Sequence, residues 1–139
     1  MAVNTLTFEE LAPRVRRAPY HQWLGVELTA LDDEGIEITL PWRDEFLSSV
    51  EPPYGHGGII AALIDLAADF AVAAMAGRGA PTVDLRVDYL RAAGPGPLRA
   101  RARVLRLGRS LATAEADVFD QAERKVASGR AVFFMGNGG

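Results

Sequence analysis

The sequence predicts an α+β fold in which a curved antiparallel β-sheet wraps around one long central α-helix. A run that is apolar except for Asp65 and Asp69 extends from residue 59 to residue 76. Two runs with the alternation of strands precede it and four follow it, with turn residues between them. Because a helix that is apolar on all sides must be buried, strands before and after it favour a sheet that curves over it.

The N-terminal segment predicts a short helix from Phe8 to about Arg17. Thr7 and Glu10 have the spacing of a capping box, in which each side chain accepts a hydrogen bond from the other residue's backbone N–H. Pro19 is expected to end this helix, because a proline disfavours helical geometry in the residue before it.

Residues 23–42 alternate apolar and polar side chains with the period of two that is typical of half-buried strands. The turn at residues 32–35 divides them into two strands that are expected to pair as an antiparallel hairpin. Residues 43–53 show no period and end in two prolines. We therefore expect a loop there, leading into the central helix.

The long apolar run is predicted to be a buried helix and not a membrane span. Two carboxylates near the middle of a span would cost roughly 2.5–3.5 kcal/mol each, and no aromatic or basic anchors flank the run. At 100° per residue one stripe of the helix carries Gly58, Ala61, Ala62, Asp65, Ala68, Asp69 and Val72. The opposite face carries Ile60, Leu63, Ala67, Phe70 and Ala74. The small-residue stripe is predicted to be uncovered, so that a ligand or a second backbone can approach Asp65.

Gly77 and Gly79 are expected to end the central helix. Four strands are predicted after it, at residues 82–91, 98–107, 111–119 and 125–134. In the first of these, Val83, Leu85, Val87 and Tyr89 alternate with charged residues, which predicts that these four share one face.

Composition limits the possible function classes. With 139 residues the chain is expected to form one domain, 1–139, and its net charge of −3 lacks the basic patch of a nucleic-acid-binding protein. The absence of cysteine excludes disulfides and thiolate chemistry. Only His21 and His56 offer imidazole, so no metal site is expected, although carboxylate-bound magnesium stays open. Because no secretory signal pattern is visible, a cytoplasmic protein without a membrane partner is expected.

The motif His56-Gly57-Gly58, with Asp65 seven positions after the second glycine, resembles the hotdog-fold acyl-CoA thioesterases of the phenylacetate-degradation (PaaI-like) family. The similarity covers about residues 24–134 and includes 82–85, 89–91, 107–110 and 127–133. The resemblance implies a hotdog fold and hydrolysis of a medium-chain or aryl acyl-CoA to free acid and CoA, without metal or organic cofactor. It also implies a homodimer joined sheet edge to sheet edge, with pairs of dimers often forming tetramers.

Thioester hydrolysis needs a polarised carbonyl, together with an activated water or a carboxylate nucleophile. The first N–H groups of a long helix favour developing negative charge, and glycine lets the thioester approach the backbone. We therefore assign the N–H of Gly57 or Gly58 as the oxyanion donor. Asp65 is assigned as general base or as nucleophile, and the sequence leaves both roles open.

The spacing of these two groups predicts a site shared between two chains. Gly57 and Asp65 are eight residues apart, which is about 12 Å along a helix, so one carbonyl cannot easily touch both. Two antiparallel helices across a two-fold axis would bring Gly57 of one chain to Asp65 of the other, giving two equivalent sites.

Three other residues near the motif are weighed against structural roles. Thr82 stands at the start of the strand after the helix, where its hydroxyl can orient Asp65 or a water; the alternative is an ordinary β-branched strand residue. His56 is expected to shape the loop by a local hydrogen bond, and a helix N-terminus disfavours its charged form as a general base. Asp69 is expected to have a structural role, with a partner or a water at the interface between subunits.

Further residues are candidates for contact with the CoA phosphates and with other parts of the substrate. Arginines bind phosphates in a bidentate manner, so the CoA phosphates are expected to meet some of Arg91, Arg106 and Arg109. Many relatives of the resembled family have a polar residue six positions before the motif histidine, where this chain has Val50. Glu51 and Tyr54 are the nearest polar candidates for contact with the substrate.

Two other functions remain open on the sequence. A hotdog dehydratase or hydratase ranks low, because such enzymes place their catalytic histidine and acid differently. A non-catalytic module that binds or senses acyl-CoA is favoured only by Val50. The acyl group and the choice between dimer and tetramer stay open.

Overall fold

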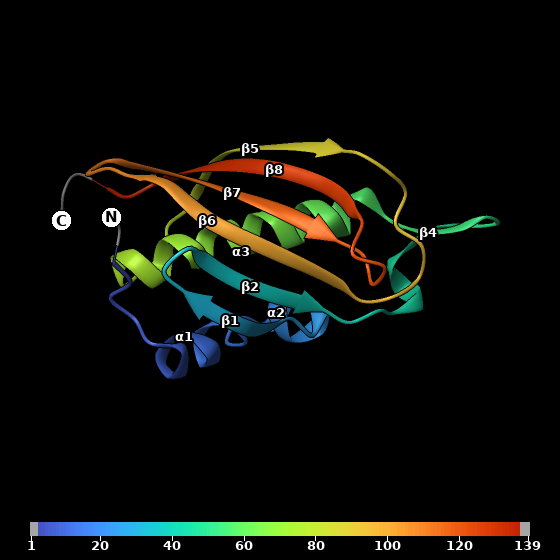
Figure 1. Ribbon diagram of the computed structural model, residues 1–139, viewed down its shortest axis with the longest axis horizontal. Coiled ribbons are helices and arrows are strands. Elements are labelled where there is room, and N and C mark those ends of the chain that lie inside the picture. Colours follow the sequence, from blue (N-terminus) through green and yellow to red (C-terminus); the bar gives the residue numbers. More distant parts are fainter. Residues whose placement is uncertain (1–2, 137–139) are drawn as a thin grey trace.

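A curved sheet lies over a long helix in the computed structural model, which describes residues 3–136 (Figure 1). The elements in chain order are α1 (Phe8–Val15), α2 (Pro19–Leu24), β1 (Glu27–Asp32), β2 (Gly35–Leu40), η1 (Asp44–Phe46), β3 (Leu47–Val50), β4 (Pro53–Gly55), α3 (Gly57–Ala76), β5 (Thr82–Tyr89), β6 (Leu98–Leu107), β7 (Leu111–Phe119) and β8 (Lys125–Phe134). Six strands form one antiparallel sheet in the order β1-β2-β6-β7-β8-β5. This is the predicted hotdog architecture.

The helix α3 packs on a sheet face that is lined by small side chains. The inward residues of the three central strands β6, β7 and β8 include Ala100, Ala102, Ala112, Ala114, Ala116, Ala127, Gly129 and Ala131. Ile64, Ala68 and Val72 of α3 are fully buried in the same core. Because the facing side chains are short, the helix lies close to the sheet, and its position is fixed by direct contact.

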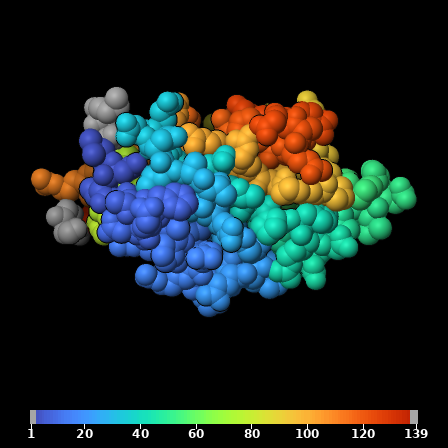
Figure 2. All heavy atoms as spheres, turned by 60° about the horizontal axis from the view of Figure 1, so that its bottom comes forward, coloured from blue at the N-terminus to red at the C-terminus, as the bar shows by residue number. Residues whose placement is uncertain are grey.

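The N-terminal segment covers the other side of α3. Leu11 and Val15 of α1 are fully buried in the same core as α3, and the capping box of Thr7 and Glu10 is present as predicted. The backbone N–H groups of Thr5 and Leu6 both donate to the carbonyl of Ala74, which satisfies the C-terminal end of α3. Figure 2 shows this segment and the β1–β2 hairpin forming a continuous surface.

Two boundaries near the N-terminus differ from the prediction. The first helix ends at Val15 and not at Arg17, and Trp23 and Leu24 belong to a second helix, α2, not to a strand. Pro19 begins α2 at a position where its missing N–H is not needed, and Gly25 ends it with φ of 80°. The predicted hairpin therefore begins later, at Glu27, with its turn where expected.

The segment predicted as a loop before α3 contains secondary structure. It holds the short η1 turn and the two-stranded hairpin of β3 and β4. Strands of four and three residues are too short to show a period, which is why the sequence did not indicate them. The four strands predicted after α3 are confirmed, except that β5 ends at Tyr89 and not at residue 91.

The prediction of a buried central helix agrees with the packing. By length and composition α3 is apolar enough to cross a membrane, with a mean hydropathy of 2.1 over its best window. In the structure 61% of that window is buried inside the molecule, between the sheet and the N-terminal helices. Gly77 ends the helix with φ of 82°, as expected for a glycine at this position.

The close packing of α3 on the sheet predicts that Gly129 tolerates no side chain. A Cβ atom at this residue would lie 2.7 Å from the carbonyl oxygen of Arg86 and 2.7 Å from Cγ2 of Ile64. Gly129→Ala is therefore expected to lower the free energy of unfolding by about 1–3 kcal/mol, the usual cost of overpacking. Gly94→Ala is the matched control, because a Cβ there meets no atom within 4 Å. Equal urea-denaturation midpoints for the two variants would contradict this packing account.

Candidate active site

Asp65 and Thr82 form a hydrogen-bonded pair at the uncovered side of α3. The Thr82 hydroxyl donates to Oδ1 of Asp65 over 2.7 Å. Asp65 is partly accessible and Thr82 is exposed. Among residues 3–136 no other hydrogen bond to the Asp65 carboxylate is present, so Oδ2 is free to accept a proton or to attack a carbonyl carbon. The structure thus brings together two of the predicted site residues, one from α3 and one from β5.

The small-residue stripe of α3 is accessible from Gly58 to Asp65, and beyond Asp65 only Asp69 is partly accessible. Gly58, Ala61, Ala62 and Asp65 are exposed or partly accessible. Ala68 and Val72, which were predicted to share this open stripe, are instead fully buried against β7 and β8. Packing against β7 and β8 therefore closes this stripe at Ala68 and Val72, and Asp65 is accessible beside Ala61 and Ala62.

The N-terminus of α3 has one unused N–H group among the predicted donors. His56 is the N-cap, and its Nδ1 accepts a hydrogen bond from the Gly58 N–H over 2.8 Å. The Gly57 N–H donates to no acceptor within the described part of the chain. Of the two glycines assigned as oxyanion donors, the geometry therefore leaves Gly57 available and occupies Gly58.

The same contact limits what His56 can do. Because Nδ1 accepts from the Gly58 N–H, Nδ1 carries no proton and the neutral ring has its proton on Nε2. In this arrangement His56 has no free lone pair with which to act as a general base. Its observed contact is the local hydrogen bond that shapes the start of the helix, which matches the role expected from the sequence.

Tyr89 contacts the site and was not among the predicted site residues. Its hydroxyl donates to the carbonyl oxygen of Gly57 over 2.7 Å, and a Cβ at Gly57 would lie 3.3 Å from the tyrosine ring. The sequence did give a signal for it, since Tyr89 was predicted to share a face with Leu85 and Val87 in the strand that follows the helix. What the sequence lacked was the direction of that strand, which runs back along α3 toward its N-terminus (Figure 1).

A β-bulge places Thr82 and Tyr89 on one face of β5. The register shifts between Thr82 and Asp84, so Thr82 faces Phe133 of β8 while Tyr89 faces Ala127. Phe133 and Ala127 are both buried on the inner face of the sheet. Val83, predicted to lie on that face, is 58% exposed, because it is the extra residue of the bulge.

Asp69, one turn beyond Asp65, has a structural partner. Its Oδ1 accepts from the backbone N–H of Ala80 over 3.1 Å, in the segment between α3 and β5. Burial raises the pKa of Asp69 from 3.8 to about 6, the Ala80 N–H opposes this shift, and the nearby charge of Asp65 adds to it. The structural role expected for this residue is therefore supported by a partner within the same chain.

The β3–β4 hairpin holds the predicted substrate contacts Glu51 and Tyr54. Glu51 lies in the turn of the hairpin and is exposed, beside Val50, whose side chain is 78% exposed. Tyr54 is partly buried on β4. Figure 1 shows this hairpin projecting from the body of the molecule, beyond the N-terminal end of α3. Within one chain, the hairpin tip is thus separate from the Asp65–Thr82 pair.

The predicted phosphate-binding arginines lie at opposite ends of the sheet. Arg91 is the second residue after β5 and lies at the same end of that strand as Tyr89, which contacts the N-terminus of α3. Arg106 and Arg109 lie in and after the end of β6, at the other end of the sheet (Figure 1). All three are exposed and form no ion pair within residues 3–136. One substrate cannot meet Arg91 and Arg109 of the same chain.

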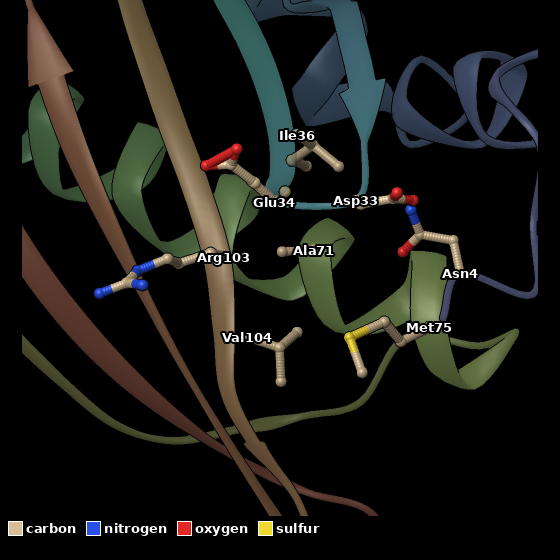
Figure 3. A pocket seen from close by; sticks show the side chains of 9 residues that line it. Asn4, Asp33, Glu34, Ile36, Ala71, Met75, Arg103 and Val104 are labelled. Atoms are coloured by element: carbon tan, nitrogen blue, oxygen red, sulfur yellow. The ribbon is translucent and has the colours of Figure 1, made fainter. Parts of the chain in front are cut away.

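A cavity of about 290 Å³ lies away from these residues, at the corner between β2, β6 and the second half of α3 (Figure 3). Its floor is apolar and its rim carries Asp33, Glu34 and Arg103. None of the predicted site residues lines it. The Asp65 side of α3 instead opens toward β5, at the edge of the sheet, which fits a site that a single chain does not enclose.

The fold and the glycine-initiated helix with its aspartate define a hotdog protein of the thioester-cleaving class. A family model described as the thioesterase superfamily matches residues 54–127, more than half of the chain. The chain belongs to the thioesterase superfamily. The predicted enzyme class, a thioester hydrolase, is confirmed at this level.

Individual relatives agree with this assignment. A protein of Halobacterium salinarum with a provisional esterase name is 36% identical over 123 residues, 80% of each chain. The medium/long-chain acyl-CoA thioesterase YigI of Escherichia coli is 26% identical over 139 aligned positions, 88% of each chain. An X-ray structure of a protein from the thioesterase superfamily is 45% identical, with a TM-score of 0.89 over 93% of this chain and 98% of that one.

The partly buried carboxyl of Asp69 predicts a specific dependence of stability on pH. A folded-state pKa raised from 3.8 to about 6 favours the folded protein below pH 4, and this contribution is lost as the pH rises through 6. Asp69→Asn keeps an oxygen for the Ala80 N–H and removes the charge. It is expected to raise the free energy of unfolding by about 1–3 kcal/mol at pH 7 and by little at pH 4.

The measurement is urea denaturation at both pH values and at fixed protein concentration. Asp33→Asn, in the exposed β1–β2 turn, is the matched control for loss of one carboxylate. A gain from Asp69→Asn that is equal at pH 4 and pH 7 would contradict the burial of a titrating carboxyl.

Proposed function

We propose that this protein hydrolyses acyl-CoA thioesters with medium-chain or aryl acyl groups to a free carboxylic acid and CoA. The observation that carries the proposal is the Asp65 carboxylate, held by Thr82 on the accessible stripe of a helix whose first N–H is unused. The name of YigI supports an acyl-CoA substrate. The spacing from His56-Gly57-Gly58 to Asp65 supports a place in the PaaI-like branch of the superfamily.

In this proposal the Gly57 N–H stabilises the oxyanion. The N-terminal end of a helix favours negative charge, and α3 is 20 residues long. Glycine at this position exposes the N–H, because no Cβ shields it. The charge on the carbonyl oxygen develops only in the transition state, so this contact accelerates the reaction and does not merely bind substrate.

Asp65 supports two routes to the same products. As a general base it takes a proton from water while the water oxygen attacks the thioester carbon; the C–S bond then breaks and the proton passes to the thiolate. As a nucleophile its free Oδ2 attacks the carbon and expels the thiolate, and water then cleaves the resulting mixed anhydride. In both routes Thr82 fixes the carboxylate through Oδ1.

The two functional groups are proposed to meet across a homodimer. They are separated by about two turns of one helix, roughly 12 Å. β5 is an edge strand of the sheet and most of its residues are exposed, which supports edge-to-edge pairing with a second copy. Two helices that run antiparallel across the two-fold axis then present Gly57 of one chain to Asp65 of its partner. The proposal also includes the association of two such dimers into a homotetramer.

The site assignment predicts opposite results for two neighbouring aspartates. Asp65→Asn is expected to lower kcat by roughly 10²–10⁴, the usual worth of a general acid–base group. Asp69→Asn makes the same chemical change one turn along the same helix and is expected to leave kcat within about twofold of wild type. The measurement is release of free thiol from a panel of medium-chain and aryl acyl-CoAs.

Two outcomes contradict the proposal in different ways. If Asp65→Asn keeps the wild-type rate, Asp65 is not the catalytic carboxylate. If the wild-type protein binds acyl-CoAs but releases no thiol from any of them, it is a binding or sensing module and not an enzyme for this substrate class.

A further inference from the structure

We infer that Tyr89 is a positioning residue that fixes the oxyanion donor, an inference that rests on the proposed thioester hydrolysis. It is the one residue of the sheet whose side chain hydrogen-bonds to the first residue of α3 in the described structure. It approaches from the end of β5, while Thr82 at the start of the same strand holds Asp65. One strand therefore holds both halves of the catalytic machinery of its own chain.

The peptide between Gly57 and Gly58 is held at both ends. Its carbonyl oxygen accepts from the Tyr89 hydroxyl over 2.7 Å, and its N–H donates to Nδ1 of His56 over 2.8 Å. A carbonyl oxygen has two lone pairs, so the Tyr89 contact is compatible with a helical hydrogen bond to the same oxygen. With both polar groups of this peptide fixed, residue 57 cannot rotate freely. The direction of the preceding Gly57 N–H is therefore set as well.

The tyrosine ring also shapes the space around the donor. A Cβ at Gly57 would lie 3.3 Å from two ring carbons and from the hydroxyl oxygen of Tyr89, so the ring packs tightly against the glycine and would shift by a few tenths of an ångström to admit a side chain. Tyr89 is itself 52% exposed, so part of the ring remains open beside the N-terminus of α3. The ring thus forms a wall next to the unused N–H.

The backbone around Tyr89 is fixed by the sheet. Tyr89 pairs with Ala127 of β8, and the N–H of Leu90 donates to the carbonyl of Val126 over 2.9 Å. The bulge between Thr82 and Asp84 brings Thr82 onto the inner face that carries Tyr89, although their odd separation in a regular strand would put them on opposite faces. The bulge is what allows one strand to contact α3 at both places.

This geometry predicts an effect on the rate and not on substrate binding. An oxyanion donor contributes only if it already points to the oxygen that becomes charged. Loss of the Tyr89 hydroxyl leaves the ring and the N–H in place but frees the peptide plane. Since the oxyanion exists only in the transition state, kcat falls while KM stays.

The test compares Tyr89→Phe with Tyr20→Phe. Tyr20, on α2, is 51% exposed like Tyr89, and its hydroxyl forms no hydrogen bond to the rest of the described chain. Tyr89→Phe is expected to lower kcat for acyl-CoA hydrolysis about tenfold, with KM within twofold and an unchanged Tm. Tyr20→Phe is expected to match wild type. Equal kcat values for the two variants, or a loss in Tyr89→Phe that appears only in KM or Tm, overturn the inference.

A second measurement does not depend on activity. Amide hydrogen exchange at Gly58 is expected to be several-fold faster in Tyr89→Phe than in Tyr20→Phe, because the peptide has lost one of its two fixed ends. Unchanged exchange at Gly58 overturns the inference even if the protein hydrolyses acyl-CoAs. Faster exchange at Gly58 in a protein that hydrolyses no acyl-CoA supports the positioning role of Tyr89 and contradicts the proposed function.

Discussion

The seat of α3 on a sheet face of alanine and glycine is the packing on which the rest of the structure depends. Short side chains such as Ala114 and Gly129 let an apolar helix lie against three strands. That close contact fixes the direction of α3 and its distance from the sheet, because a close-packed interior leaves no room for a shift of even one methylene group. β7 and β8 bury Ala68 and Val72 of the helix, while Gly57 and Asp65 remain partly accessible.

In the proposed mechanism, one chain carries two halves of a site that do not meet within it. Asp65 and Thr82 form one half near the middle of α3, and Gly57 with His56 and Tyr89 forms the other at its start. β5 contacts both, runs antiparallel to the helix and lies at the edge of the sheet. In the proposed homodimer, a second copy joined along this edge would complete each half with the opposite half of its partner. The cavity near Met75 and Val104 is unrelated to this arrangement.

Much of the fold could be predicted because it follows from periodicity and turn residues. The central helix and the strands after it were placed nearly to the residue, since their apolar patterns are long. The β3–β4 hairpin and α2 were missed because short elements show no period. In the site, Asp65 and Gly57 followed from motif spacing, whereas Tyr89 did not. Alternation placed Tyr89 on the face of Leu85 and Val87, but its contact with Gly57 depends on the direction in which β5 runs along α3. The bulge at Val83, which brings Thr82 onto the same face, shows only in the strand pairing.

The sharing of the site between chains is tested most directly by subunit complementation. Gly57→Pro removes the oxyanion donor, and proline is well accepted at the first position of a helix, while Asp65→Asn removes the carboxylate. Each variant alone is expected to be nearly inactive. Co-refolding equal amounts gives mixed dimers in which one of two sites is intact, so about a quarter of wild-type activity is expected from random pairing. If the mixture shows no more activity than the separate variants, the two groups do not act across chains.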